Sequence, residues 1–360
     1  FPVRDPFFNM LKRSLNTFMN AFTASDWTAY PFASQNPKDF DNLLQVYLDA
    51  VFFPTLDPLD FAQEGHRLEP ESLDELSGPL VLKGVVYNEM KGAMSPPASQ
   101  VHSTLQSHLF PTITYHHNSG GDPERIPDLT HQQLIDFHAR HYHPSNALFL
   151  TYGDFPVATH HERIHDLALR RFDHLECDLA VPDERRYREP QRVCADYAVD
   201  GHHPGDDQCH VLVGWLLGHS ADVRQLLRAH LLHGVLMEHS GSPLRAALET
   251  TPLGSAPSEL CGLDDSLREA TFVVGLEGAK AEDGDAIEAL VLDVLEEVAT
   301  HGIPHEDVLA TLHQLELSQR EVGGDHFPYG LRLMLRAMGP ALHGGNPVSA
   351  LDIEIGRAHV

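Results

Sequence analysis

The sequence predicts an α+β fold in which two similar modules follow one another along the chain. Two alternating segments, residues 17–23 and 28–34, flank a polar turn and predict an antiparallel hairpin. Helical apolar stripes and short apolar strands then alternate, and the same order of strand and helix recurs after residue 190. A chain of 360 residues with 42% hydrophobic residues is long enough for two domains, each with a substantial core.

The first module continues from the hairpin into helices and strands that their caps and periodicity indicate. Asn36 and Pro37 begin a helix that extends to about residue 53 and carries apolar residues on one face. The further elements expected in this module are a helix at 59–68, a strand at 80–86 leading into a helical turn at 88–92, a short helix at 101–110 within a loop-rich stretch, a helix after Thr130, a strand at 147–152 and a helix at 158–172.

The polar, proline-containing stretch 176–190 is the expected linker between the two modules. It divides the chain into a first domain at residues 1–175 and a second at residues 191–353. The elements expected in the second domain are a strand at 210–216, helices at 221–237 and 244–249, a strand at 270–276, and helices at 285–300 and 304–321.

The chain is strongly acidic, with a formal net charge of −27 from 25 Lys and Arg against 52 Asp and Glu. This charge makes nucleic acid a poor candidate partner and favours basic partners, although an acidic surface also serves solubility alone. The longest apolar runs, at residues 50–53 and 211–217, are far too short to cross a membrane, so no membrane association is expected.

Cysteine and histidine usage gives no metal site by itself. The four cysteines, Cys177, Cys194, Cys209 and Cys261, lack the C-x-x-C spacing and are expected to be free thiols of a reducing compartment. None of the histidine clusters has a zincin spacing with an internal Glu, so we do not expect metal at 116–117, 138–143, 160–165 or 202–203.

Glu89 is the first candidate functional residue, because it follows the buried strand at 80–86 where the chain turns into a helix. A carboxylate held by backbone on both sides suits a metal ligand or a catalytic base. The alternative is an exposed glutamate that the helix dipole favours in a first turn.

Three stretches around these elements carry a resemblance to a known family. They are SLNTFMNAFTASDWTAYPFASQNPKDFDNLLQVYLDAVFFP, QEGHRLE and GVVYNEMKG, in that order. They closely resemble the presequence proteases, pitrilysin-like zinc peptidases of the insulinase superfamily, over most of residues 1–175, and more loosely over 187–350. The resemblance implies tandem pitrilysin-type domains, each a mainly antiparallel sheet with helices packed on it, the first truncated and the second non-catalytic and incomplete.

In the resembling family, two His of an inverted H-x-x-E-H motif and a distal Glu bind Zn²⁺, and the Glu within the motif is the general base. The distal Glu falls on Glu89. The motif itself is missing from this sequence. The family places it immediately before the segment that corresponds to the residues beginning at Phe1. The family's C-terminal half is also absent from the resemblance, so we expect this chain to lack catalytic residues and to be inactive alone.

The resemblance also implies a substrate-binding segment at Asn20, Ala21 and Phe22. These residues fall on the edge strand to which the family adds an extended peptide through backbone hydrogen bonds. An ordinary sheet strand is the alternative for this segment.

The function implied is zinc-dependent endopeptidase cleavage of unfolded peptides such as targeting presequences, by a parent protein expected to be a monomer with a closed chamber. A non-catalytic scaffold or assembly subunit of the same superfamily is the alternative. We expect the bacterial cytoplasm, or the mitochondrial matrix if the source is eukaryotic.

The last seven residues, EIGRAHV at 354–360, match the translation of a common sequencing adapter, GAG-ATC-GGA-AGA-GCA-CAC-GTC. We therefore expect residues 354–360 to be an artefact rather than protein.

Overall fold

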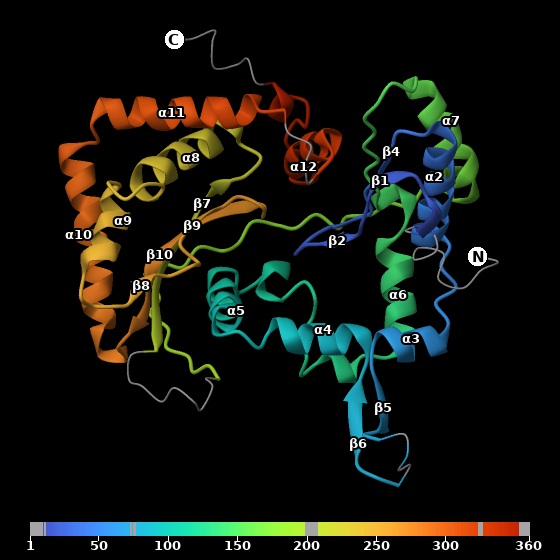
Figure 1. Ribbon diagram of the computed structural model, residues 1–360, viewed down its shortest axis with the longest axis horizontal. Coiled ribbons are helices and arrows are strands. Elements are labelled where there is room, and N and C mark those ends of the chain that lie inside the picture. The colour runs from blue at the N-terminus through green and yellow to red at the C-terminus, as the bar shows by residue number, and fades with distance from the viewer. Residues whose placement is uncertain are drawn as a thin grey trace. The chain divides into compact units, whose positions relative to one another are not determined.

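The computed structural model describes residue 10 and residues 12–72, 74, 77–198, 208–322 and 327–352 (Figure 1). These residues form two units. Unit 1 contains the described residues of 1–94, 117–180 and 323–335, and unit 2 those of 95–116, 181–322 and 336–360. The unit boundary at residues 180 and 181 falls within the predicted linker, and the predicted domain limits stay predictions. The suspected adapter sequence at 354–360 lies outside the described residues.

The predicted hairpin of unit 1 is present as two short ladders. Strand β1 (Asn16–Met19) pairs with β4 (Phe32–Ser34), and β2 (Phe22–Thr23) pairs with β3 (Thr28–Ala29), all antiparallel. A turn closes the hairpin where Ala24 N donates to Trp27 O at 2.9 Å. The pairing is interrupted at residues 20–21, between β1 and β2.

Helix α2 (Pro37–Phe52) confirms the predicted apolar stripe. Asn36 accepts hydrogen bonds from the backbone N–H groups of Lys38 and Asp39, and Pro37 occupies the first helical turn, as the sequence predicts. The buried face carries Leu44, Leu48 and Phe52, which pack with the end of helix α7 (Val157–Leu167).

The next elements differ partly from those predicted. Helix α3 (Pro58–Glu64) is shorter than the predicted helix at 59–68, because residues 67 and 68 belong to strand β5 (Arg67–Pro70). That strand pairs with β6 (Leu80–Lys83), which leads into helix α4 (Val85–Ala93). Here the pairing of Arg67 with Lys83 and of Leu68 with Leu82, 16 and 14 residues away, overrides the local helical periodicity.

Helix α6 (His131–His141) begins at a capping box in which Thr130 and Gln133 satisfy each other's backbone N–H groups. The strand predicted at 147–152 is wrong. These residues form no ladder with any strand in the described part of the chain, and a strand needs a partner for its backbone groups.

The centre of unit 2 is a long antiparallel pair, β7 (Cys209–His219) with β10 (Glu269–Ala279), onto which β8 (Ala256–Pro257) and β9 (Gly262–Asp264) also pair. Helices cover both faces of the β7–β10 pair, which explains why the sequence of β7 is continuously apolar. Val274 and Leu276 pack with helices α8, α9 and α10, whereas Leu216 belongs to the cluster around Phe110 on the opposite face.

The four helices predicted for the second domain are present in the predicted order (Figure 1). They are α8 (Val223–Met237), α9 (Pro243–Thr250), α10 (Gly284–His301) and α11 (His305–Arg320). Unit 2 also contains α5 (Pro97–Leu109), predicted as part of the first module, and α12 (Tyr329–Leu342), which was not predicted, has residues in both units. Helix α5 is longer than the short helix predicted at 101–110. Among the described helices, none combines the length and apolar character that a membrane span requires.

Candidate functional site

Helix α4, which carries Glu89, is placed by a close backbone approach at Gly84. Gly84 lies between β6 and α4, and a Cβ added there would lie 2.0 Å from Gly65 O. In addition, Tyr87 N donates to Gly65 O at 3.3 Å and Asn88 N donates to Gly84 O at 3.0 Å. Only glycine allows the two backbone segments to meet in this way, so Gly84 fixes where α4 begins.

The two faces of α4 differ at adjacent residues. Met90 is 8% exposed, and a Cβ added at Gly120 would lie 2.2 Å from its Sδ, so Met90 fixes the inner face of the helix. Glu89 is exposed, and its carboxylate makes no hydrogen bond or ion pair with any described residue. Its carboxylate is therefore open to an external ligand.

The expected environment of Glu89 needs a correction. The change from strand to helix lies at Gly84, and Glu89 is the fifth residue of α4. Among the described residues, no backbone group holds its carboxylate. The helix-dipole alternative is weakened for the same reason, because the dipole effect is confined to the first turn.

The donor set for a metal is incomplete in the described part of the chain. A carboxylate without competing hydrogen bonds is chemically suited to zinc, but no group of three His, Cys, Asp or Glu residues converges among the described residues. Glu89 alone does not make a metal site, and two further ligands would have to come from elsewhere.

The histidine clusters have other partners. His138 Nε2 lies 2.9 Å from Val51 O, and His116 Nδ1 lies 3.0 Å from Ser107 O. His160 is buried between the rings of Phe40 and Phe155. The pair at 202–203 lies outside the described residues.

The segment Asn20–Phe22 covers the interruption of the hairpin at residues 20–21 and the first residue of β2. Asn20 N donates to Pro31 O at 3.1 Å. Pro31 has no N–H that could donate to the Asn20 carbonyl, and this carbonyl accepts from Tyr47 Oη at 3.3 Å instead. Burial raises the pKa of Tyr47 to about 12, which keeps the hydroxyl protonated as a donor.

The other side of this segment pairs with no strand among the described residues. Within the described residues β1 pairs only with β4, and β2 only with β3. Ala21 N donates to the Asn20 side chain at 2.8 Å, and both residues are exposed. An extended peptide could therefore add along this edge after displacing one side-chain hydrogen bond.

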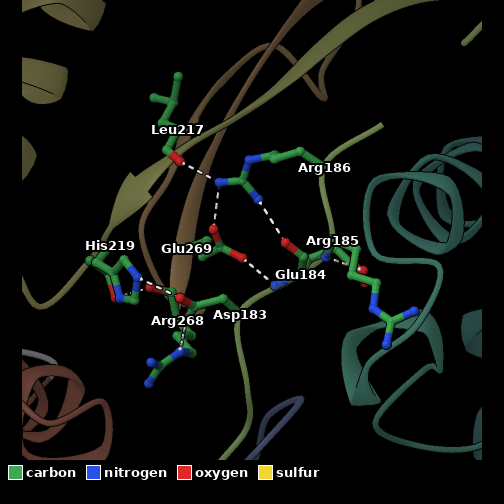
Figure 2. A network of polar contacts seen from close by, with 9 residues as sticks. Asp183, Glu184, Arg185, Arg186, Leu217, His219, Arg268 and Glu269 are labelled. Atoms are coloured by element: carbon green, nitrogen blue, oxygen red, sulfur yellow. Dashed lines mark hydrogen bonds and ion pairs between the residues drawn. The ribbon is translucent and has the colours of Figure 1, made fainter. Parts of the chain in front are cut away.

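A polar network in unit 2 was not predicted from the sequence (Figure 2). Glu184 and Glu269 are 5% and 3% exposed. Glu184 accepts from Thr112 N at 2.9 Å and Thr112 Oγ1 at 2.5 Å, while Glu269 accepts from Glu184 N at 2.7 Å. Arg186 then donates to Glu269 at 2.5 Å and to Leu217 O at 2.9 Å. The network attaches this segment to β7 and β10.

A second, more exposed layer surrounds these two carboxylates. Asp183 accepts from Arg268 Nε at 2.6 Å and lies 3.1 Å from His219 Nε2 (Figure 2). The Arg268 hydrogen bond lowers the pKa of Asp183 despite some burial. Burial would raise the pKa of Glu184, but the hydrogen bonds from Thr112 and from the backbone of Arg185 and Ile113 together outweigh it and lower that pKa. Every carboxylate here is used internally, so the network is structural.

No sequence signal distinguished this network. Asp183, Glu184 and Arg186 lie in a polar, charged stretch that is typical of a linker, and their partners are about 30 to 85 residues away in the chain. Only the fold brings them together.

The fold and the comparisons define the class of protein. Residues 128–315 match the family described as peptidase M16 inactive domain, and the chain belongs to the M16 peptidase family. The structure is a mixed helix and antiparallel sheet fold of the M16 type. It matches an M16-like peptidase from Alicyclobacillus acidocaldarius with a TM-score of 0.61 and 17% identity, over 97% of this chain and 80% of that one. It also matches pitrilysin with a TM-score of 0.56 and 16% identity, over 98% of this chain and 36% of that one.

Particular relatives are much more similar in sequence. Mitochondrial presequence proteases of Xenopus tropicalis and Mus musculus are 43% and 44% identical over 354 residues, which is 98% of this chain. That of Gibberella zeae is 40% identical over the same length. The chain spans about a third of these relatives' length, 34% for the first two. The predicted resemblance to this family is confirmed.

Proposed function

We propose that the whole protein is a zinc-dependent endopeptidase of unfolded peptides, such as targeting presequences, and that this chain supplies Glu89 as one metal ligand. The observation that carries the proposal is the 40–44% identity to presequence proteases over 98% of the chain, with Glu89 presented as an exposed carboxylate that has no internal partner among the described residues.

The chemistry assigned to this chain is limited to positioning. A bound zinc would polarise the scissile carbonyl and activate water. Gly84 and Met90 fix helix α4, so that the Glu89 carboxylate is held on a defined outer face. Since no group of three metal-ligating side chains converges among the described residues, the proposal takes the two further ligands and the general base from other parts of the whole protein.

The peptide would bind along Asn20–Phe22 by adding a strand to this edge. Backbone hydrogen bonds recognise any extended sequence, which suits an enzyme of broad specificity. The net charge of −27 favours basic peptides by long-range attraction. A monomeric parent with a closed chamber remains part of this proposal.

The compartment proposed is the mitochondrial matrix, because the relatives are named as mitochondrial proteins. The bacterial cytoplasm, expected first from the sequence, finds no support among these relatives.

The test is cleavage of a fluorogenic unfolded peptide by the purified full-length protein. We expect zinc-dependent cleavage that a chelator abolishes, and a loss of roughly 100-fold in kcat/KM for Glu89→Gln. Glu124→Gln, another exposed carboxylate of unit 1, is the matched control and should cleave normally. This 360-residue chain alone should not cleave the peptide.

One observation favours the non-catalytic alternative, namely that the matched domain is described as inactive. The same assay separates the two functions. A full-length protein that binds no zinc and cleaves no peptide would be a scaffold or assembly subunit, and Glu89→Gln would then change nothing.

A further inference from the structure

Three aromatic side chains from distant parts of the sequence meet beside the proposed peptide-binding edge. The ring centroids of Phe18 and Phe22 are 6.1 Å apart, and those of Phe18 and Phe327 are 5.6 Å apart. Phe22 and Phe327 complete the group at 6.4 Å. All three belong to unit 1, so their mutual placement is defined within one unit. We call Phe18, Phe22 and Phe327 the aromatic triad.

The triad flanks the edge segment along the strand direction. Phe18 lies in β1 and Phe22 begins β2, with Asn20 midway between them. Residues two apart in extended chain point to the same face, so positions 18, 20 and 22 share a face over the segment where a peptide would add. Phe327 covers this face from a segment about 300 residues away.

The triad is not a sealed core. Phe327 is 42% exposed, and Phe18 and Phe22 are only half-buried. Clustered apolar side chains that remain partly open to water, next to a strand edge without a strand partner among the described residues, are the arrangement that binds apolar side chains of an added strand.

We propose that the aromatic triad is a side-chain subsite that binds one bulky apolar or aromatic residue of the extended peptide, with Phe327 as its specificity-determining residue. This inference rests on the proposed function. A peptide that pairs with the edge would direct alternate side chains over the triad face, and one of these would contact Phe22 and Phe327. Backbone pairing would then give affinity for all peptides, and the triad would give preference at one position.

The experiment measures cleavage of a series of unfolded peptides by the full-length protein. The peptides are identical except for a single Phe, which is moved along an otherwise alanine-rich sequence. We expect one position at which Phe lowers KM relative to Ala. In Phe327→Ala, the ratio of the KM values for the all-Ala and the preferred Phe peptide should fall about tenfold. The kcat values and the cleavage of the all-Ala peptide should not change.

Two variants control for bulk and for a general loss of apolar surface. Phe327→Leu keeps the apolar volume and should retain most of the preference. Phe137→Ala removes another exposed aromatic side chain of unit 1, on helix α6 and 56% exposed, and should leave the preference intact. If Phe327→Ala does not fold, Phe327→Gln keeps the length without the apolar surface and carries the same prediction.

A backbone variant separates this inference from the proposed function. Ala21→Pro removes the N–H on the edge and should weaken all the peptides equally. If wild-type protein cleaves no peptide, the proposed function fails. A different pattern would rule out only the subsite. In that pattern, wild-type protein cleaves the peptides and Ala21→Pro weakens their cleavage, but Phe327→Ala changes cleavage of the Phe-containing and all-Ala peptides equally or not at all.

Discussion

Glu89 in unit 1 and Glu184 with Glu269 in unit 2 are carboxylates in opposite situations. Glu89 is exposed on α4 without a partner among the described residues, whereas Glu184 and Glu269 are almost completely buried and accept hydrogen bonds from backbone and side-chain donors. A carboxylate whose acceptors are filled contributes to stability, and one whose acceptors are empty is available to a metal. Acidic character alone would not have separated the two roles.

The largest expected effect on stability comes from breaking the buried network. Glu269→Ala removes the acceptor of Glu184 N and leaves Arg186 without its carboxylate partner. We expect the free energy of local unfolding to fall by about 3 kcal/mol. This value is at the lower end of the effect of breaking a buried ion pair, because Arg186 is partly exposed.

Hydrogen–deuterium exchange in the full-length protein measures this change at residues 183–187 and in β10. Glu277→Ala on the same strand is the control, since its carboxylate makes none of these hydrogen bonds, and it should leave that protection unchanged. Equal protection in wild type and Glu269→Ala would mean that the network does not hold the segment.

A smaller effect is expected where α4 begins. Gly84→Ala would bring a Cβ within 2.0 Å of Gly65 O, so the backbone must shift at a cost of about 2 kcal/mol. Exchange of the α4 amides should rise, and zinc affinity should fall because Glu89 moves with the helix. Gly92→Ala on the same helix meets nothing within 4 Å and should be neutral or slightly stabilising. Normal α4 protection in Gly84→Ala would refute the positioning role.

The smallest expected effect depends on pH. Burial opposes ionisation of Glu184, but the hydrogen bonds that it accepts, chiefly from Thr112, lower its pKa in the folded state below the ordinary 4.5. Its ionised form therefore stabilises the fold above that value. This contribution, about 1 kcal/mol, should be lost as the pH falls below 4.5 through the folded-state pKa.

The measurement is the difference in local stability of residues 183–187 between wild type and Glu184→Gln from about pH 7 to about pH 3. The difference should be constant near neutrality and shrink in acid, because protonated Glu and Gln are both uncharged. A difference that grows as the pH falls would contradict the sign of the shift.

Local patterns predicted the helices better than the strands. The caps at Asn36 and Thr130 define their helices within the sequence itself. By contrast, Arg67 and Leu68 carry a helical pattern but pair with β6, and residues 147–152 carry a strand pattern but have no ladder partner among the described residues. Strand assignment depends on pairing, which local sequence does not contain.

The candidate site was predictable only in part. Glu89 was recognised from its family context, but its exposure and its position inside α4, which begins directly after Gly84, required the fold. The aromatic triad could not be predicted, because Phe327 lies about 300 residues from Phe22 and only the fold brings it beside the predicted peptide-binding segment. The family resemblance gave the identity of candidate residues, and the structure gave their partners.

Zinc binding by the full-length protein tests the central claim most directly. Wild type, Glu89→Gln and the control Glu124→Gln would each be titrated with zinc against a chelator of known affinity, at neutral pH. The account predicts one tightly bound zinc in wild type and in Glu124→Gln, with affinity roughly 100-fold weaker in Glu89→Gln. Equal zinc affinity in Glu89→Gln and wild type would contradict the assignment of Glu89 as a metal ligand.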